Sequence, residues 1–271
     1  MTAIALTIAG SDSGGGAGIQ ADLKTFSALG AYGASVVTAI TAQNTRGVTG
    51  VEDVSPAMVA AQMDAVFGDL RVDALKIGMV SRCATIEAIA EGLAGFAGPV
   101  VLDPVMVATS GDRLLQEEAI EALRTRLVPR AALVTPNLPE AALLTGLPMA
   151  ESEAQMIAQG EAILALGAAA VLVKGGHGAG PDSTDILLNA EGLRRFTVPR
   201  IETRHDHGTG CTLAAAITAG LARGKGLTAS VTAAKAYLTA ALAAGRTLGI
   251  GTGRGPVHHF HAWWSAEDGA A

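Results

Sequence analysis

Short apolar runs alternate along the chain with longer segments in which apolar residues recur at helical spacing. Runs such as residues 4–8 and 74–77 are too short for a helix and predict buried strands. Strands are expected at residues 4–8, 35–40, 74–77, 100–102, 132–135 and 171–174, with 186–188 and 193–198 pairing as a hairpin. Helices are expected at residues 21–29, 58–67, 85–93, 117–127, 151–166, 211–222 and 230–244, and another begins near Pro139. This alternation predicts an α/β fold, with a mostly parallel central sheet and helices on both faces.

Composition narrows the class of protein. The chain has 271 residues, 49% of them hydrophobic and 16% charged, which suits one large α/β domain over residues 1–271, and no linker or repeat divides it. The net charge of −6 comes without a basic block, so we expect no nucleic-acid partner. The N-terminus lacks a basic region before its apolar run, and the uncharged stretch at 208–222 is too short to cross a bilayer. With two widely separated cysteines, these features predict a reduced cytoplasmic protein without a membrane partner.

Polar residues follow several of the expected strands. Asp12, Asp103, Asn137 and Lys174 all stand at or just beyond a strand's carboxyl end. Open sheets of this class bind ligands at that edge, so the sequence predicts a site there.

The glycine-rich segment 10–18 joins a strand to a helix. A dinucleotide fingerprint fits it only loosely, because Ile19 stands where a glycine or alanine is needed, and no lysine marks it as a P-loop. It is either a sharp turn or a ligand-binding loop.

The segment HGTGCT at 207–212 opens an expected helix. Backbone N–H groups at a helix start attract anions, and Gly208 and Gly210 allow a phosphate to approach closely. The alternative is an ordinary N-terminus capped by Thr209, with Cys211 as a small core residue. Beside a phosphoryl group, the amide dipoles would lower the pKa of the Cys211 thiol.

Three charged residues and a histidine-rich segment are further candidates. Lys174 either pairs with a phosphate or extends to solvent. Glu140 and Asp103 could hold Mg²⁺ through water. The histidines of HHFH at 258–261 point in different directions and make a weak metal site.

Together these segments resemble the hydroxymethylpyrimidine/phosphomethylpyrimidine kinases of thiamine synthesis. The resemblance runs from Ile4 to Trp264. It rests on GGGAGIQADLKT at 14–25, QNT at 43–45, KIGM at 76–79, VLDPVM at 101–106, TPNLPEA at 135–141, VKGGH at 173–177, HGTGCTL at 207–213 and GPVHHFHAWW at 255–264. It implies a ribokinase-like three-layer α/β/α sandwich and a homodimer. It also implies ATP-dependent phosphorylation of the hydroxymethylpyrimidine to its monophosphate and then to its diphosphate.

The resemblance also assigns roles to individual residues. The pyrimidine site would comprise Gly10, Asp22, Gln43, Met79 and Val107, with Asp22 and Gln43 binding the ring edge and Met79 and Val107 its faces. The backbone of Gly208, Thr209, Gly210 and Cys211 would hold the transferring phosphoryl group, and Lys174 would neutralise the ATP phosphates. Asp103 and Glu140 would organise Mg²⁺.

Two departures from related patterns bear on the substrate. Cys211 stands where ribokinase-like sugar kinases usually carry an aspartate base, which favours the pyrimidine-kinase branch. Thr109 replaces a lysine that relatives often have, so one cation over the phosphates is missing. A pyridoxal kinase remains an alternative, although some of those enzymes use a second cysteine near Ala108. A non-catalytic pyrimidine-binding sensor is the alternative from another class.

Overall fold

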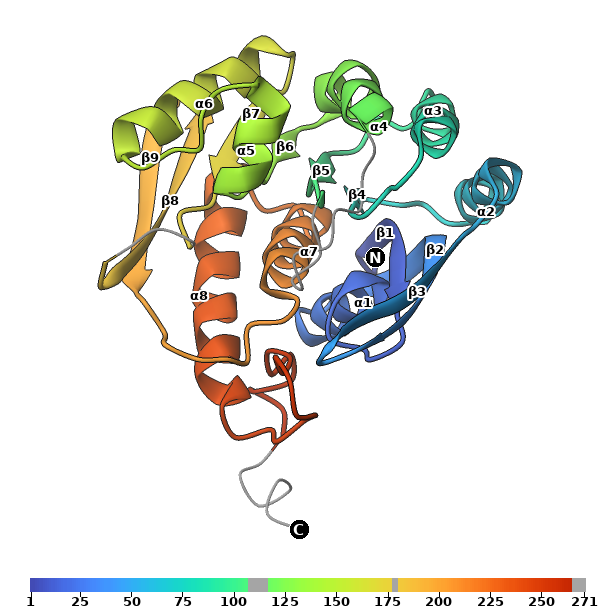
Figure 1. The fold of residues 1–271 in the computed structure, drawn as a ribbon. Coiled ribbons are helices and arrows are strands. Elements are labelled where there is room, and N and C mark those ends of the chain that lie inside the picture. The colour runs from blue at the N-terminus through green and yellow to red at the C-terminus, as the bar shows by residue number, and fades with distance from the viewer. Residues whose placement is uncertain (107–116, 177–179, 265–271) are drawn as a thin grey trace.

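The computed structural model describes residues 1–106, 117–176 and 180–264, and within these ranges the strands form one nine-stranded sheet. Its order is β3-β2-β1-β4-β5-β6-β7-β8-β9 (Figure 1). The strands are β1 Ile4–Asp12, β2 Tyr32–Asn44, β3 Gly47–Asp53, β4 Ala74–Ile77, β5 Val100–Leu102, β6 Leu133–Val134, β7 Ala170–Val173, β8 Asp182–Asn189 and β9 Gly192–Pro199. From β2 through β7 neighbouring strands are parallel, whereas β3, β8 and β9 pair antiparallel at the two edges.

Helices cover both faces of the sheet. The helices are α1 Gly18–Ala28, α2 Pro56–Asp69, α3 Cys83–Gly92, α4 Glu117–Ala122, α5 Leu138–Thr145, α6 Glu153–Ala165, α7 Thr209–Ala222 and α8 Leu227–Gly245. Helices α1, α7 and α8 lie on one face, and α2 to α6 lie on the other (Figure 1). The expected three-layer α/β/α architecture is therefore confirmed.

Side chains along each strand alternate between the two cores. On β1, Leu6 and Ile8 enter the core beneath α2 and α3, whereas Ala5 enters the core beneath α1 and α7. Thr7 also faces α1, where its hydroxyl meets a carboxylate described below. The α1/α7 face is built largely from alanine, which lets these helices approach the sheet closely.

Most expected elements are present, with a few differences. Strands β4 and β5 have the predicted bounds, whereas β3 was not predicted because its alternating burial carries little apolar character. The expected helix over residues 117–127 ends as α4 at Ala122 and continues as a π-helical turn, Leu123–Leu127. The predicted hairpin is present as β8 and β9.

Among the residues that the structure describes, one helix, α8, is long and apolar enough to span a membrane. A third of its apolar stretch is buried in the protein (33%). It packs against α7 and carries Lys235, whose ammonium lies 2.6 Å from the carboxylate of Asp185 on β8. A buried ion pair with the sheet is typical of a helix inside a folded domain. Core helices of soluble proteins commonly have the same length and apolarity.

Candidate active site

A cavity of about 790 Å³ opens at the carboxyl ends of the central strands. Of the predicted site residues, it is lined by Gly10, Gln43, Met79, Asp103, Glu140, Lys174, Gly208, Thr209, Gly210 and Cys211. The fold brings these residues together because parallel strands β1, β4, β5, β6 and β7 all end at the same edge. Val107, and with it Ala108 and Thr109, lies outside the described residues.

The start of α7 is open to a ligand. The helix begins at Thr209 and has no side-chain cap, so the alternative in which Thr209 caps it is wrong. Gly208 occupies the cap position with φ +80°, and a Cβ there would lie 1.9 Å from the carbonyl oxygen of Gly16. Only glycine fits this position. The first-turn N–H groups, which no intrahelical carbonyl can accept, therefore face the cavity as an anion site.

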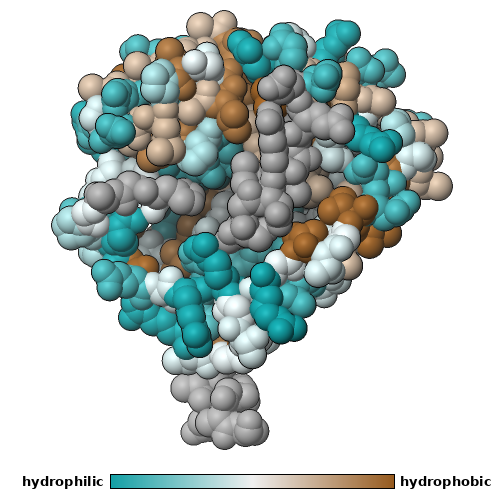
Figure 2. All heavy atoms as spheres, in the orientation of Figure 1, coloured by the Kyte–Doolittle hydropathy of each residue, from teal (hydrophilic) through white to brown (hydrophobic). Residues whose placement is uncertain are grey.

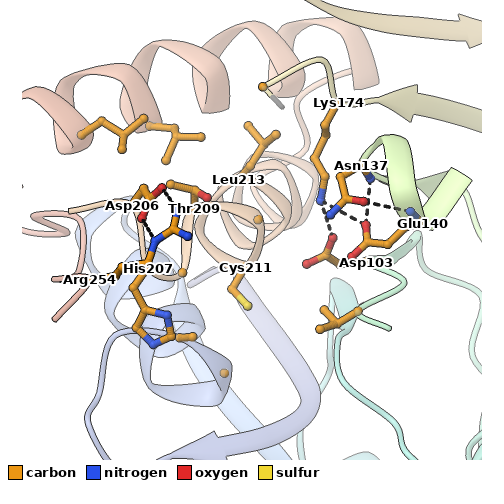
Figure 3. A pocket seen from close by; sticks show the side chains of 18 of the residues that line it. Asp103, Asn137, Glu140, Lys174, Asp206, His207, Thr209, Cys211, Leu213 and Arg254 are labelled. Atoms are coloured by element: carbon orange, nitrogen blue, oxygen red, sulfur yellow. Dashed lines mark hydrogen bonds and ion pairs between the residues drawn. The ribbon is translucent and has the colours of Figure 1, made fainter. Parts of the chain in front are cut away.

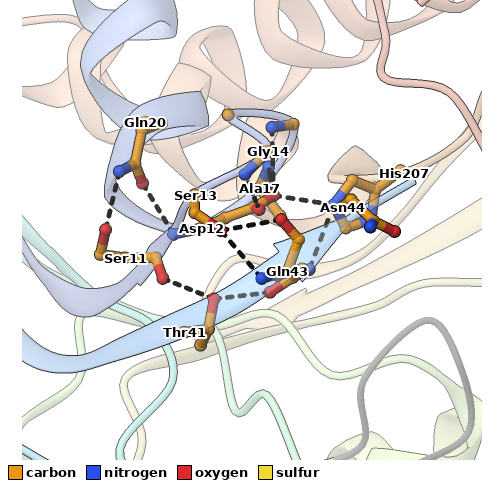
Figure 4. Close-up of polar contacts among 12 residues, drawn as sticks. Ser11, Asp12, Ser13, Gly14, Ala17, Gln20, Thr41, Gln43, Asn44 and His207 are labelled. Atoms are coloured by element: carbon orange, nitrogen blue, oxygen red, sulfur yellow. Dashed lines mark hydrogen bonds and ion pairs between the residues drawn. The ribbon is translucent and has the colours of Figure 1, made fainter. Parts of the chain in front are cut away.

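The glycine-rich loop after β1 is organised by Asp12. Its carboxylate accepts hydrogen bonds from the backbone N–H groups of Gly14 (2.8 Å), Gly16 (3.1 Å) and Ala17 (2.8 Å) (Figure 4). It also lies 2.9 Å from Nε2 of His207, the residue before the anion site. Burial opposes ionisation of Asp12, but His207 and these N–H groups outweigh it and lower its pKa. Asp12 thus ties the loop to the start of α7.

Gln43 extends from β2 toward the same junction. Its Oε1 accepts a hydrogen bond from the Thr41 hydroxyl at 3.1 Å, and its Nε2 lies 3.3 Å from Nε2 of His207 (Figure 4). The Ser13 hydroxyl accepts the backbone N–H of Gln43 and donates to the Gln43 carbonyl, at 2.8 Å each. Thr41 and His207 therefore position the Gln43 amide at the cavity wall, and Ser13 fixes the backbone that carries it. Asp12 was predicted only as one of the polar residues at strand ends, and His207 only as the first residue of the HGTGCT segment; neither was given a role in the site.

The opposite wall carries a cluster of charges (Figure 3). Nζ of Lys174 lies 2.9 Å from Oδ1 of Asp103 and 3.9 Å from Oε2 of Glu140. Burial alone would lower the pKa of Lys174, but the two carboxylates outweigh it and raise it. Burial likewise opposes ionisation of Asp103, yet Lys174 and then Lys76 hold its pKa below the usual value.

Glu140 serves both the fold and the site. Its Oε2 accepts the Asn137 N–H at 2.8 Å, while Asn137 Oδ1 accepts the Glu140 N–H at 2.9 Å, which forms a capping box at α5. Burial, reinforced by Asp103, raises the pKa of Glu140 to about 7. Asn137 thus caps α5, and a carboxylate that faces the cavity stands one turn later.

A divalent cation fits this wall. Within the described ranges, Oδ2 of Asp103 is buried without a hydrogen-bond partner, although the residue is 1% exposed. A buried carboxylate oxygen left unpaired beside a second carboxylate favours a cation, since an orphaned acceptor is costly. No group of three or more histidine, cysteine or acidic residues that could hold a metal occurs in the part of the chain that the structure describes. Asp103 and Glu140 would thus bind Mg²⁺ with water supplying the other ligands.

Two expectations need correction. Asp22 was expected to bind the pyrimidine, but it is 0% exposed, does not line the cavity, and is bonded to Lys76 and Thr7. Cys211 was expected to have a lowered thiol pKa. Although the residue faces the cavity, burial raises the pKa of the thiol to about 11. Lys76 opposes this increase, and Asp22 adds to it. The site is deep enough that desolvation exceeds the helix-start effect.

Comparison with known proteins agrees with this geometry. A family model described as phosphomethylpyrimidine kinase matches residues 12–258. The chain belongs to this family. It is 67% identical to the hydroxymethylpyrimidine/phosphomethylpyrimidine kinase of Rhizobium meliloti, over 97% of this chain and 99% of that protein.

Solved structures show the same fold. A phosphomethylpyrimidine kinase from Clostridium difficile is 47% identical, with a TM-score of 0.77 over 87% of this chain and 97% of that one. An ADP complex of Bacillus subtilis pyridoxal kinase is 36% identical, with a TM-score of 0.89 over 98% of this chain and 100% of that one. The ribokinase-like fold and family are therefore confirmed, and use of ATP by this chain is consistent with both.

Proposed function

We propose that this chain transfers the terminal phosphoryl group of ATP to the hydroxymethyl group of the aminopyrimidine precursor of thiamine. A second transfer converts the monophosphate to the diphosphate in the same pocket. The observation that carries this proposal is the uncapped start of α7, which faces Lys174 and Asp103 across one cavity. Among the described residues, this pairing supplies both an anion site and the charges that phosphoryl transfer needs.

The acceptor binds at the β1 and β2 side of the cavity. The Gln43 amide offers a donor and an acceptor, which match a ring nitrogen and an exocyclic amine. Met79 follows β4, and its sulfur lies 3.3 Å from a Cβ position built on Gly10, so these two residues form an apolar surface for a flat ring. Val107, expected on the other ring face, stays a prediction from the resemblance.

The phosphates bind between the start of α7 and Lys174. The Gly210 N–H and its neighbours hold the transferring group, and a Cβ built on Gly210 would lie 3.3 Å from Nζ of Lys174. That spacing lets one phosphoryl group contact both. Mg²⁺, held through Asp103 and Glu140, would neutralise charge on the ATP phosphates. Lys174 then spans the metal side and the anion side of the cavity.

Cys211 is placed to receive the proton that the acceptor loses. As the hydroxymethyl oxygen bonds to phosphorus and the bond to ADP breaks, the hydroxyl proton passes to the thiolate. With a thiol pKa of about 11, the thiolate is a small minority at neutral pH. A loose transition state tolerates this, because it needs little deprotonation early on.

The two alternatives are disfavoured. Pyridoxal kinases share the fold, but the 67% identity to a pyrimidine kinase, against 36% to a pyridoxal kinase, favours the pyrimidine. A non-catalytic sensor would need the pyrimidine pocket but not the charges around Lys174, and these charges are present.

We further propose that the chain acts as one kinase domain in the cytoplasm and as a homodimer. The dimer is supported by exposed apolar side chains along the β2–β3 edge and the neighbouring α2, on the right of the view in Figure 2. They are Ile40 (57% exposed), Val51 (46%) and Met58 (54%). Burial of such a patch against a second copy is the usual outcome.

Phosphorus NMR tests the proposed function directly. With ATP, Mg²⁺ and hydroxymethylpyrimidine, we expect the monophosphate signal to rise first and the diphosphate signal to follow at its expense. Release of inorganic phosphate without either product would indicate simple ATP hydrolysis. Binding of the pyrimidine without any turnover would support the sensor instead.

A further inference from the structure

A fully buried ion pair lies beneath the cavity floor. Nζ of Lys76, on β4, is 2.8 Å from both carboxylate oxygens of Asp22, on α1, and both side chains are 0% exposed. The Thr7 hydroxyl donates to the same carboxylate at 2.6 Å. The register explains this meeting, because Thr7 and Lys76 are paired neighbours on β1 and β4 and both face α1.

The pair is charged although burial opposes it. Burial raises the pKa of Asp22 and would lower that of Lys76, which taken alone favours a neutral pair. Asp22, Cys211 and Asp103 outweigh burial at Lys76 and raise its pKa. Contact with both oxygens at 2.8 Å favours the ion pair, since hydrogen bonds between an ammonium and a carboxylate are short and strong.

Stability alone does not account for this pair. Taking two charges out of water costs several kcal/mol per ion, and well-packed apolar residues often replace such pairs without loss. Lys76 also lines the cavity, whereas Asp22 does not. An ammonium has three hydrogens, and the two oxygens of one carboxylate cannot take up all of them, so at least one remains for another acceptor.

Lys76 and Cys211 line the same cavity, from β4 and from the first turn of α7. Helix α7 packs on β4, and the charged groups that act on the thiol come from four other elements: Lys76 on β4, Asp22 on α1, Asp103 after β5 and Lys174 after β7. The Gly18 N–H on α1 also bonds the thiol. Lys76 is the largest favourable influence on a negative charge at sulfur.

We propose that Lys76 is a positioning residue that stabilises negative charge on Cys211 in the shared cavity, and that Asp22 and Thr7 hold its ammonium in place. This inference rests on the proposed function, because it gives Cys211 a proton to accept. Asp22, which was expected to contact the pyrimidine, then acts indirectly by holding Lys76. Asp22 fixes the cation and at the same time limits how far the cation favours the thiolate.

The two partners have opposite effects on the thiol, which makes the inference testable without any substrate. In a Cys83→Ser background, the rate of Cys211 alkylation by iodoacetamide at pH 8.5 reports the thiolate fraction. Lys76→Met should slow it roughly three- to tenfold, since the cation is lost while Asp22 can take up a proton. Asp22→Asn should speed it by a similar factor, because the cation then acts unopposed. The pH dependence of each rate separates a thiol pKa change from a change in access.

A purely structural pair would behave differently. Loosened packing would expose the thiol in both variants, so both would be alkylated faster, and this outcome would overturn the proposal.

A packed double variant covers the case in which a single variant fails to fold. Asp22→Leu with Lys76→Met replaces the pair by apolar side chains and should keep the melting temperature. We expect it to lose at least about tenfold in turnover, as when a charge-stabilising group is removed. Full turnover by the double variant, with Cys211 alkylated as fast as in the unaltered protein, would overturn the proposal. If the unaltered protein phosphorylates no pyrimidine, the proposed function fails, while the alkylation rates still decide the role of Lys76.

Discussion

Nζ of Lys174 lies 2.9 Å from Oδ1 of Asp103, so the cation expected on the ATP phosphates is already paired with a carboxylate expected at the metal. This pairing lets the lysine stay charged at the end of a buried strand before any nucleotide arrives. It also joins the two halves of the phosphate site into one charge cluster. Removal of either partner therefore affects the fold as well as catalysis.

Lys174→Met should lower kcat more than about tenfold, because a cation on the transferring phosphates is lost. A lysine that contacted only phosphate could be replaced with little change in stability, but Lys174 is also paired with Asp103. The variant leaves a carboxylate that is 1% exposed without its partner, at a cost of roughly 3 kcal/mol or more. Thermal unfolding measures this cost. Arg195→Met removes an exposed ion pair with Glu153 and should leave both melting temperature and turnover nearly unchanged. Unchanged stability in Lys174→Met would mean that the pair is not formed in solution.

Gly208→Ala should damage the anion site. The new methyl group would lie 1.9 Å from the Gly16 carbonyl oxygen, and the backbone at φ +80° disfavours any side chain. We expect kcat to fall about 10²-fold or more, since several phosphate-binding N–H groups would move. Gly226→Ala is the matched control: Gly226 caps α8, its φ is −63°, and a Cβ there meets nothing within 4 Å. Equal activity of the two variants would refute the assignment of the α7 start.

Gln43→Leu should raise the KM for the pyrimidine and leave the KM for ATP unchanged. Loss of hydrogen bonds to a buried ring edge costs roughly 1–3 kcal/mol. The neighbouring Asn44→Ala serves as a control, because the Asn44 side chain accepts the Arg46 N–H at 2.9 Å and does not line the cavity. An unchanged pyrimidine KM in Gln43→Leu would remove Gln43 from the site.

Cys211→Ala should cut kcat by about 10²-fold while ATP still binds, because the backbone N–H groups remain. The pH profile carries the sharper test. With a thiol pKa of about 11, the thiolate fraction grows tenfold per pH unit below that value. The rate of the unaltered protein should therefore rise with pH between about 7 and 9, and the variant should lose this rise. ATP with Mg²⁺ should also slow alkylation of Cys211 but not of Cys83. Near-full turnover by the variant would make the thiol a packing residue.

The sequence predicts the strands best where burial is complete. Strands β4 and β5 were predicted with their observed bounds because short continuous apolar runs have few alternatives. Strand β3 was missed because it lies at the sheet edge, is half-exposed and contains Gly47 and Gly50. Its pairing with β2 depends on a neighbouring strand rather than on its own pattern.

The candidate site was predicted as a set of residues but not as a set of contacts. Strand ends identified Asp103 and Lys174, the segment TPNLPEA identified Glu140 one helical turn after Asn137, and the fold brings the three together. The sequence could not show that Asp22 turns away from the cavity to Lys76, because that contact depends on the order β2-β1-β4 and on α1 crossing it. The pKa of Cys211 was misjudged for a related reason: depth in the fold, which motifs do not encode, outweighs the helix start.

The most direct test of the account compares kcat/KM for hydroxymethylpyrimidine, its monophosphate and pyridoxal in one coupled kinase assay. Gln43 offers the pyrimidine edge an amide donor and acceptor, and a site built for such hydrogen bonds discriminates strongly against rings that lack the partners. We expect both pyrimidines to be phosphorylated with kcat/KM at least about tenfold above that for pyridoxal. Pyridoxal preferred over both pyrimidines, or neither pyrimidine phosphorylated, would contradict the account.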